Sequence, residues 1–262
     1  MVGKVEEYLL RKILNEGAIH ITLIDPERAS GEFAAFISSE SESLGSSAIM
    51  IGGTTLVSPN ALDDVVKAVK ESASIPAILF PNNVTGISRY ADAIWFMSLL
   101  NSADPYFIVG AQVLAAPLIK KFGLEAIPLG YIIVGEGGSA GVIGKACPIP
   151  YNKPELAVAH ALAAQFLGMR FVYLEAGSGA KSPVPLEMVR AVKNAISMPL
   201  IVGGGIRTGE QAKHIVSAGA DIVVTGTITE IGKKEEVKNK LMEIIKGVKE
   251  GAKSKVKELN LS

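Results

Sequence analysis

The stretch "VGGGIRTGEQAKHIVSAGADIVVTGT", residues 202–227, contains two short apolar runs that each end in glycine, with a segment of helical pattern between them. The first run ends in three glycines, and the second ends in Gly226 and Thr227. A helix between two such runs is typical of parallel strands, because a parallel connection needs a crossover of a dozen or more residues. The stretch therefore predicts a strand–helix–strand unit of an α/β protein.

Runs of the same kind recur along the whole chain, and most of them alternate with longer segments of helical pattern. The eight runs are "HITLIDP", "AIMIGGT", "PAILFPN", "AIWFMSLLN", "AIPLGYIIV", "FVYLEAG", "PLIVGGG" and "IVVTGT". Near-continuous apolar runs of this length are typical of strands that are buried on both faces of a parallel sheet. Eight units predict one closed (β/α)₈ barrel, a single domain over residues 1–262, with an extra N-terminal helix in "MVGKVEEYLLRKILNEG".

Two connections depart from a regular barrel. Only Asn82–Asp92 separate the third run from the fourth, which is too short for a crossover helix with its loops, so we expect the third helix to be missing or replaced. The Gly- and Pro-rich segment Val134–Asn152 is far longer than a usual connection. Because loops on that face carry the chemistry of barrel enzymes, we expect this segment to cover the site; a disordered insertion without a role is the alternative.

Composition limits the kind of partner. The chain has 26 basic and 26 acidic residues, so no net field gathers nucleic acid, and an anionic ligand must be held by a local device. Cys147 is the single cysteine, which excludes an internal disulfide and fits a reducing cytoplasm. No signal-peptide pattern is found, and no apolar run approaches the roughly 20 residues that a bilayer requires. We therefore expect a cytoplasmic protein without stable membrane insertion.

The glycines at the ends of the seventh and eighth runs predict a phosphate site. Gly204, Gly205 and Gly226 leave backbone N–H groups uncovered, and the helices that follow are expected to offer unpaired N-terminal N–H groups with partial positive charge. Phosphate sites in barrels commonly lie after strands seven and eight. The alternative is that these glycines only turn the chain.

An acidic residue ends the sixth run, in "FVYLEAGSGA" at residues 171–180. Alternation places Tyr173 and Glu175 on one face of the strand, over the barrel mouth, with Ser178 close to the same anion. A carboxylate would repel a phosphate, but it suits a hydroxyl group as a hydrogen-bond acceptor or general base. The ligand is therefore expected to carry both groups, unless Glu175 only pairs with Arg207 or Lys181.

The first two runs end in oxygen-bearing side chains. Asp25 follows the first run in "LIDPE", and Thr54 follows the second in "GGTT". A carboxylate with one or two further oxygens is how Mg²⁺ is often held when a substrate phosphate completes its shell. Turn chemistry or a helix cap is the alternative for an Asp-Pro pair.

Aromatic residues and methionine gather around the fourth run, from Trp95, Phe96 and Met97 to Tyr106 and Phe107. Core packing explains most of them. The short connection after the third run would nevertheless leave an open side, where either an apolar groove for a long hydrocarbon chain or a subunit interface would form.

Seven blocks of the chain, in order, resemble the geranylgeranylglyceryl phosphate synthases and the related bacterial heptaprenylglyceryl phosphate synthases. These blocks are "HITLIDPE", "IGGTTLVSPN", "PAILFPNN", "ADAIWFMSLLNS", "YLEAGSGA", "IVGGGIRTGEQA" and "GADIVVTGT". The resemblance implies transfer of a geranylgeranyl group from its diphosphate to the 3-hydroxyl of sn-glycerol 1-phosphate, with Mg²⁺ and loss of pyrophosphate. It also implies a barrel modified at its third helix.

The resemblance assigns site residues by position. Asp25 and Thr54 would bind Mg²⁺, and Glu175 and Tyr173 are the candidate catalytic residues. The residues that would hold sn-glycerol 1-phosphate are Tyr173, Leu174, Glu175, Ala176, Gly177, Ser178, Gly179, Gly204, Gly205, Gly226 and Thr227. Lys181 receives no role. The oligomeric state, a dimer or a hexamer, stays open, as does the prenyl chain length.

Two other functions fit the same residues. A phosphate-binding-barrel isomerase or synthase acting on a phosphorylated sugar or amine would use Asp25 and Glu175 as its acid and base. A barrel that only binds a phosphorylated metabolite would keep the glycines and need no metal.

Overall fold

A computed structural model describes residues 2–55, 58–226 and 233–259. Eight parallel strands form a closed barrel in the order of the sequence, and β1 pairs with β8 to close it. The strands are β1 (Ile19–Ile24), β2 (Ala48–Ile51), β3 (Ala77–Leu79), β4 (Ala93–Leu99), β5 (Glu125–Ile133), β6 (Phe171–Glu175), β7 (Leu200–Gly203) and β8 (Ile222–Thr225). The predicted fold class is confirmed, and each predicted run matches one strand, with β1 and β5 beginning one residue before their runs.

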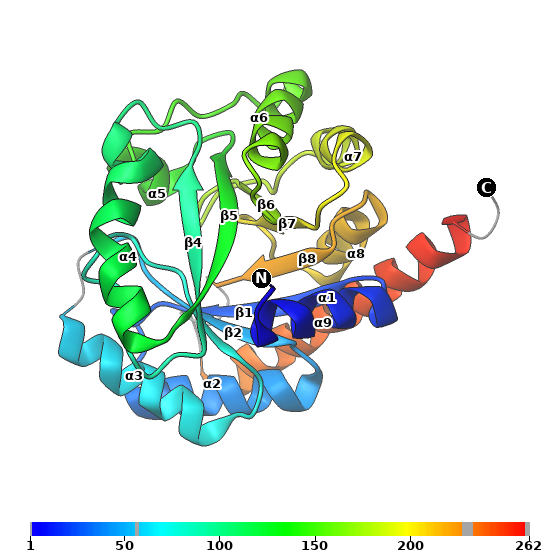
Figure 1. Ribbon diagram of the computed structural model, residues 1–262. Coiled ribbons are helices and arrows are strands. Elements are labelled where there is room, and N and C mark those ends of the chain that lie inside the picture. The colour runs from blue at the N-terminus through cyan, green and yellow to red at the C-terminus, as the bar shows by residue number, and fades with distance from the viewer. Residues whose placement is uncertain (1, 56–57, 227–232, 260–262) are drawn as a thin grey trace.

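Helices surround the barrel, and the predicted N-terminal helix is present as α1 (Figure 1). The helices are α1 (Lys4–Glu16), α2 (Gly31–Leu44), α3 (Pro59–Ser72), α4 (Ala111–Phe122), α5 (Gly138–Ile143), α6 (Pro154–Phe166), α7 (Leu186–Ala195), α8 (Gly209–Ser217) and α9 (Lys234–Leu259), with a π-helical turn η1 (Tyr106–Gly110) before α4. None of these described helices is both long and apolar enough to cross a membrane.

Alternation along the strands divides the core into an inner and an outer part. The side chains of Trp95, Phe171 and Tyr173 pack inside the barrel. The intervening Val172 and Leu174 pack outward against the helices. A period of two along every strand produces this division, because successive side chains point to opposite faces of a sheet. The inner face of β6 therefore ends with Glu175 at the rim.

No helix or strand occurs in residues 80–92, which connect β3 to β4 and are all described. The predicted loss of the third crossover helix is thus confirmed. By contrast, α2, α6 and α8 each lead into a glycine with positive φ, at Gly45 (103°), Gly168 (81°) and Gly219 (123°). These glycines end the helices in a conformation that other residues rarely adopt.

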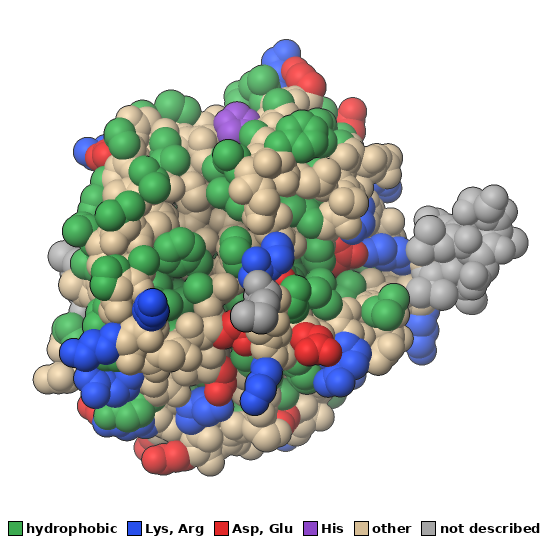
Figure 2. All heavy atoms as spheres, viewed as in Figure 1, with side chains coloured by type: hydrophobic (Ala, Val, Ile, Leu, Met, Phe, Trp, Pro, Cys, Tyr) green, Lys and Arg blue, Asp and Glu red, His purple; other side chains and the backbone are tan. Residues whose placement is uncertain are grey.

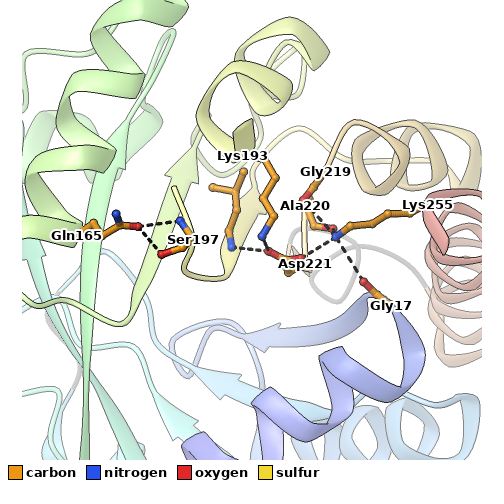
Figure 3. A network of polar contacts seen from close by, with 9 residues as sticks. Gly17, Gln165, Lys193, Ser197, Gly219, Ala220, Asp221 and Lys255 are labelled. Carbon is orange, nitrogen blue, oxygen red and sulfur yellow. Dashed lines mark hydrogen bonds and ion pairs between the residues drawn. The ribbon is translucent and has the colours of Figure 1, made fainter. Parts of the chain in front are cut away.

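The amino-terminal end of the barrel is held by a buried carboxylate that precedes β8. The Asp221 side chain is 7% exposed and lies 2.6 Å from the Nζ atoms of both Lys193 on α7 and Lys255 on α9. It also accepts a hydrogen bond of 2.9 Å from the backbone N–H of Leu200. Figure 3 shows the two lysines converging on this carboxylate from opposite sides. Asp221 therefore joins two helices to the barrel at the end opposite the strand carboxyl ends.

Replacing this carboxylate tests its contribution to stability. We expect Asp221→Ala to lower the free energy of unfolding by about 3 kcal/mol, because two ammonium groups and one amide lose a buried partner. Urea unfolding followed by circular dichroism measures the change. Asp64→Ala, at an exposed position on α3, is the control and should stay within about 0.5 kcal/mol of the parent. Equal stabilities for the two variants would contradict this role of Asp221.

Candidate active site

One cavity opens at the carboxyl end of the barrel, and much of its polar wall comes from residues at or just beyond the strand ends. The predicted site residues Asp25, Thr54, Glu175, Ser178, Gly204, Gly205 and Gly226 line it. Polar residues and glycines that the sequence analysis did not place in the site also line it: Gly52, Gly53, Asn82, Asn83, Gln112, Gly144 and Thr225. Parallel strands bring their carboxyl ends to the same rim, so residues far apart in the chain meet there.

Glu175 is buried at this rim, 7% exposed, and its Oε1 accepts a hydrogen bond of 2.6 Å from the backbone N–H of Gly177. Burial raises the pKa of Glu175, and the hydrogen bonds from Tyr173 and the Gly177 amide oppose that rise. A carboxylate with a raised pKa is a stronger base than an exposed one.

The alternative role of Glu175, an ion pair with Arg207 or Lys181, is not what the structure shows. Glu175 forms no ion pair within the described ranges. Arg207 donates instead to the backbone oxygens of Gly179 and Lys181. The carboxylate therefore faces the cavity with hydrogen-bond donors as its neighbours.

Tyr173 lies directly below Glu175 in an aromatic cluster on the floor of the cavity. Its ring centroid is 5.7 Å from that of Phe80 and 5.3 Å from that of Tyr131. Burial raises the pKa of both tyrosines well above the ordinary value, so both hydroxyls stay protonated and can donate. Sequence reasoning missed Tyr131. The continuous apolar run "LGYIIV" does not show which face Tyr131 takes; its pairing with Tyr173 across β5 and β6 places it on the inner face.

The loops after β6 and β7 interlock through glycine. Gly204 and Gly205 have φ angles of 82° and 71°. A Cβ atom on Gly204 would lie 2.4 Å from Glu175 Oε1 and 2.6 Å from the Gly177 nitrogen. One on Gly205 would lie 2.6 Å from the Ser182 oxygen. Both positions therefore need glycine for conformation and for space.

One part of the phosphate prediction is wrong: the N-terminus of α8 is not unpaired. The Thr208 hydroxyl accepts from the backbone N–H of Gln211, and the Gln211 side chain accepts from that of Thr208. Glu243 on α9 accepts from the N–H of Gly209 at 2.9 Å. This reciprocal cap and a carboxylate already satisfy the helix end, so an anion here would meet loop amides instead. Thr227 lies outside the described residues.

The predicted binding residues of the loop after β6 differ in what they present. Ser178 lines the cavity, and Gly177 donates its N–H to Glu175. The side chains of Leu174 and Ala176 pack against the outer helices, so these two residues have only backbone to offer a ligand. Gly179 lies beyond the cavity wall, with its carbonyl oxygen bonded to Arg207.

Asp25 and Thr54 line the cavity beyond β1 and β2, whereas Ser178 and Gly204 line it beyond β6 and β7. Asp25 Oδ1 accepts from the backbone N–H of Glu27 at 2.9 Å, so the carboxylate also takes part in the turn after β1. Its Oδ2 lies 3.8 Å from Arg28 Nε. The two predicted metal ligands thus share one wall and are both hard oxygen donors, which suits Mg²⁺.

No group of three or more His, Cys, Asp or Glu side chains within the described ranges is placed to hold a metal ion. A divalent cation beside Asp25 would therefore need oxygens from hydroxyl groups, water or substrate. Mg²⁺ is commonly bound in this way, through one or two carboxylates and substrate phosphates.

The cavity continues as an apolar channel between β4 and α4. Ile94 and Phe96 on the outer face of β4 line it together with Ala115 and Ile119 of α4, and Ile87 of the β3–β4 connection closes one side. This channel lies on the side of the barrel where the connection between β3 and β4 has no helix. The predicted apolar groove is therefore present.

Hydrophobic side chains also gather on the outside of the molecule over α4 and α5 (Figure 2). Val109, Val113 and Leu114 are 54%, 65% and 63% exposed. This surface is compatible with self-association, and the dimer or hexamer stays a prediction.

The long segment after β5 folds over part of the cavity. It contains α5, and Ala140, Ile143 and Gly144 line the cavity wall. A Cβ atom added to Gly138 would lie 3.3 Å from the Cα atom of Gly177, so the two loops are in close contact. The segment is thus ordered against the loop after β6 and lines part of the cavity.

Comparison with known proteins shows the family. A family model described as the PcrB family matches residues 11–248. The chain belongs to the PcrB family. A geranylgeranylglyceryl phosphate synthase from Thermofilum pendens is 51% identical over 258 residues, which cover 98% of this chain and 100% of the relative. One from Pyrococcus furiosus is 56% identical over 248 residues, covering 94% and 98%.

A solved structure of the same kind of enzyme resembles the whole barrel. The crystal structure of (S)-3-O-geranylgeranylglyceryl phosphate synthase from Thermoplasma acidophilum in complex with its substrate sn-glycerol-1-phosphate has a TM-score of 0.90 and 43% identity. The match covers 95% of this chain and 100% of that one. This PcrB-family chain and that enzyme therefore share one fold along nearly their full length.

A methyl group on Gly203 tests whether Tyr173 must occupy its place in this PcrB-family cavity. Its Cβ would lie 2.1 Å from the Tyr173 hydroxyl oxygen and 2.9 Å from Cζ, so the ring must move. We expect Gly203→Ala to lower turnover at least tenfold and stability by about 1–3 kcal/mol. Gly31→Ala, whose methyl would meet Ala68 at 3.7 Å, is the control and should change neither. Unchanged turnover of Gly203→Ala would show that the position of Tyr173 does not matter.

Proposed function

We propose that this chain is a prenyltransferase that transfers the geranylgeranyl group of geranylgeranyl diphosphate to the 3-hydroxyl of sn-glycerol 1-phosphate. The observation that carries the proposal is the continuity of one cavity, from a polar rim with Glu175 to an apolar channel beside β4. A ligand pair with an anionic polar part and a long hydrocarbon part suits such a cavity. The names of the relatives, geranylgeranylglyceryl phosphate synthases, support the same assignment.

sn-Glycerol 1-phosphate would bind beside β6, β7 and β8. Its phosphate would meet the backbone of Gly204, Gly205 and Gly226, which line the cavity. Its hydroxyl groups would reach Glu175 and the Tyr173 hydroxyl below it.

The reaction joins the 3-oxygen of glycerol to carbon one of the prenyl group. The bond from that carbon to the diphosphate oxygen breaks, its electron pair leaves with pyrophosphate, and the hydroxyl proton passes to Glu175. Holding both reactants in one cavity replaces a bimolecular encounter by a positioned attack, which contributes several kcal/mol to the rate. Tyr173 keeps the Glu175 carboxylate oriented by donating to it.

Asp25 and Thr54 would hold Mg²⁺ at the wall beyond β1 and β2. When bound there, the ion would neutralise charge that develops on the departing pyrophosphate. The backbone N–H of Glu27 fixes one oxygen of the Asp25 carboxylate, so the side chain meets a ligand in a set orientation.

Product analysis tests the proposal directly. The protein is mixed with radiolabelled prenyl diphosphates of differing length and sn-glycerol 1-phosphate, with and without Mg²⁺. We expect an organic-soluble, phosphorylated ether and pyrophosphate, with geranylgeranyl diphosphate as a substrate. A sugar-phosphate isomerase would form no such product, and a barrel that only binds metabolites would bind sn-glycerol 1-phosphate without turnover.

The raised pKa of Glu175 predicts the acid side of the pH profile. The base form exists only above that pKa, so kcat/KM for sn-glycerol 1-phosphate should fall as the pH drops through a value above the ordinary range of Glu. Tyr173→Phe removes a hydrogen bond that lowers the pKa of Glu175, so the fall in kcat/KM should move to higher pH.

Substitution of Glu175 tests its role as the base. Glu175→Gln should lose about 100-fold or more in kcat. Full turnover of Glu175→Gln excludes the base role.

Substitution of Asp25 tests the cation site. We expect Asp25→Asn, which keeps the shape and removes the charge, to lower kcat roughly 100-fold and to weaken the response to Mg²⁺. The dissociation constant of sn-glycerol 1-phosphate alone, measured by calorimetry, should stay within about twofold. Turnover of the parent protein that persists in excess EDTA would disprove a required cation.

A further inference from the structure

Arg207, the last residue of "GGGIR", takes no part in the proposed chemistry, yet its guanidinium donates two hydrogen bonds to one loop. Its Nη2 donates to the Gly179 oxygen at 3.0 Å and its Nη1 donates to the Lys181 oxygen at 3.1 Å. Arg207 itself is exposed, and these two backbone oxygens are hydrogen-bond acceptors for its side chain. A planar guanidinium that meets two acceptors at once is held more narrowly than an ammonium would be.

The backbone of Arg207 is fixed independently of the loop. Its N–H donates to Gln211 Oε1 at 2.7 Å, and that oxygen also belongs to the cap of α8. The preceding Ile206 is buried, 6% exposed. Arg207 thus has a fixed backbone in the connection between β7 and α8, and its guanidinium reaches the loop after β6.

The loop that it reaches is held at its start by the bond from the Gly177 N–H to Glu175 and near its end by the bond from the Tyr151 hydroxyl to the Ser182 oxygen, and Arg207 contacts the part between them. Gly177 and Gly179 have φ angles of 105° and 75°, and the Cβ position of Gly179 has no atom within 4 Å. Glycine lowers the cost of such angles but also increases the freedom of the chain. The N–H of Ala180 donates to the Gly177 oxygen at 3.1 Å. The peptide unit between Gly179 and Ala180 is therefore held at both ends. Arg207 donates to its carbonyl oxygen, and its N–H donates to the Gly177 oxygen.

We propose that Arg207 is a positioning residue for sn-glycerol 1-phosphate: its bidentate contact with Gly179 and Lys181 holds the loop after β6 so that Ser178 lines the cavity. The inference rests on the proposed function, because it names the substrate of that site. Arg207 does not touch the substrate. It acts through the loop, and the loss of its two hydrogen bonds would leave the glycines free to adopt other angles before binding.

Three variants separate geometry from charge. Arg207→Ala should weaken calorimetric binding of sn-glycerol 1-phosphate and raise its KM about tenfold, while the KM of the prenyl diphosphate and the thermal midpoint change little. Arg207→Lys keeps the positive charge but loses the planar group that donates to two acceptors at once. It should therefore weaken binding of sn-glycerol 1-phosphate nearly as much as Arg207→Ala does. Arg190→Ala, which removes an exposed arginine of α7, should match the parent. Ethylguanidinium at millimolar concentration should restore part of the lost affinity of Arg207→Ala.

Three results would overturn the inference. The first is an Arg207→Ala variant that binds sn-glycerol 1-phosphate as tightly as the parent. The second is an Arg207→Lys variant with parental affinity, which would show that charge alone is needed. The third is an equal increase of the KM values for sn-glycerol 1-phosphate and for the prenyl diphosphate in Arg207→Ala. A parent protein that binds no sn-glycerol 1-phosphate would refute the proposed function, and this inference with it. A parent that binds and turns over while the variants do not differ from it would refute the inference alone.

Discussion

Closure of the eight-stranded parallel sheet is the constraint on which the rest of the structure depends. Hydrogen bonds between β1 and β8 complete the ring, and parallel pairing then places every strand carboxyl end on one rim. Asp25, after β1, and Glu175, at the end of β6, come from opposite parts of the chain and line one cavity for this reason. The other end of the barrel carries structural charge instead, where Asp221 joins α7 and α9.

At the functional rim, polarity is concentrated where the loops after β6 and β7 interlock. Close approach of backbone to backbone at Gly204 and Gly205 excludes side chains and buries the Glu175 carboxylate among amides. Burial makes that carboxylate more basic, while its donors keep it oriented. Arg207 gives the outer part of the same loop a fixed shape. Flexible glycines and rigid hydrogen bonds thus serve one site.

The missing helix between β3 and β4 makes the barrel asymmetric. A regular crossover would cover the outer face of β4 from that side, where Phe96 and Ile94 instead line a channel with α4. One deleted element therefore creates the apolar half of the cavity, and the polar half uses loops common to phosphate-binding barrels. The two halves meet above the aromatic floor of Phe80, Tyr131 and Tyr173.

The sequence by itself determined the barrel, the absent third helix and the place of Tyr173 and Glu175 on the inner face at the rim, because apolar runs, their spacing and a period of two are local properties of a chain. Only the tertiary structure decided the partners: Arg207 bonds to Gly179 and Lys181 instead of Glu175, the α8 N-terminus is closed by Thr208, Gln211 and Glu243, and Tyr131 joins the floor. Hydrogen bonds between distant residues depend on atomic positions within about 3 Å. Such positions arise only when the whole ring has closed.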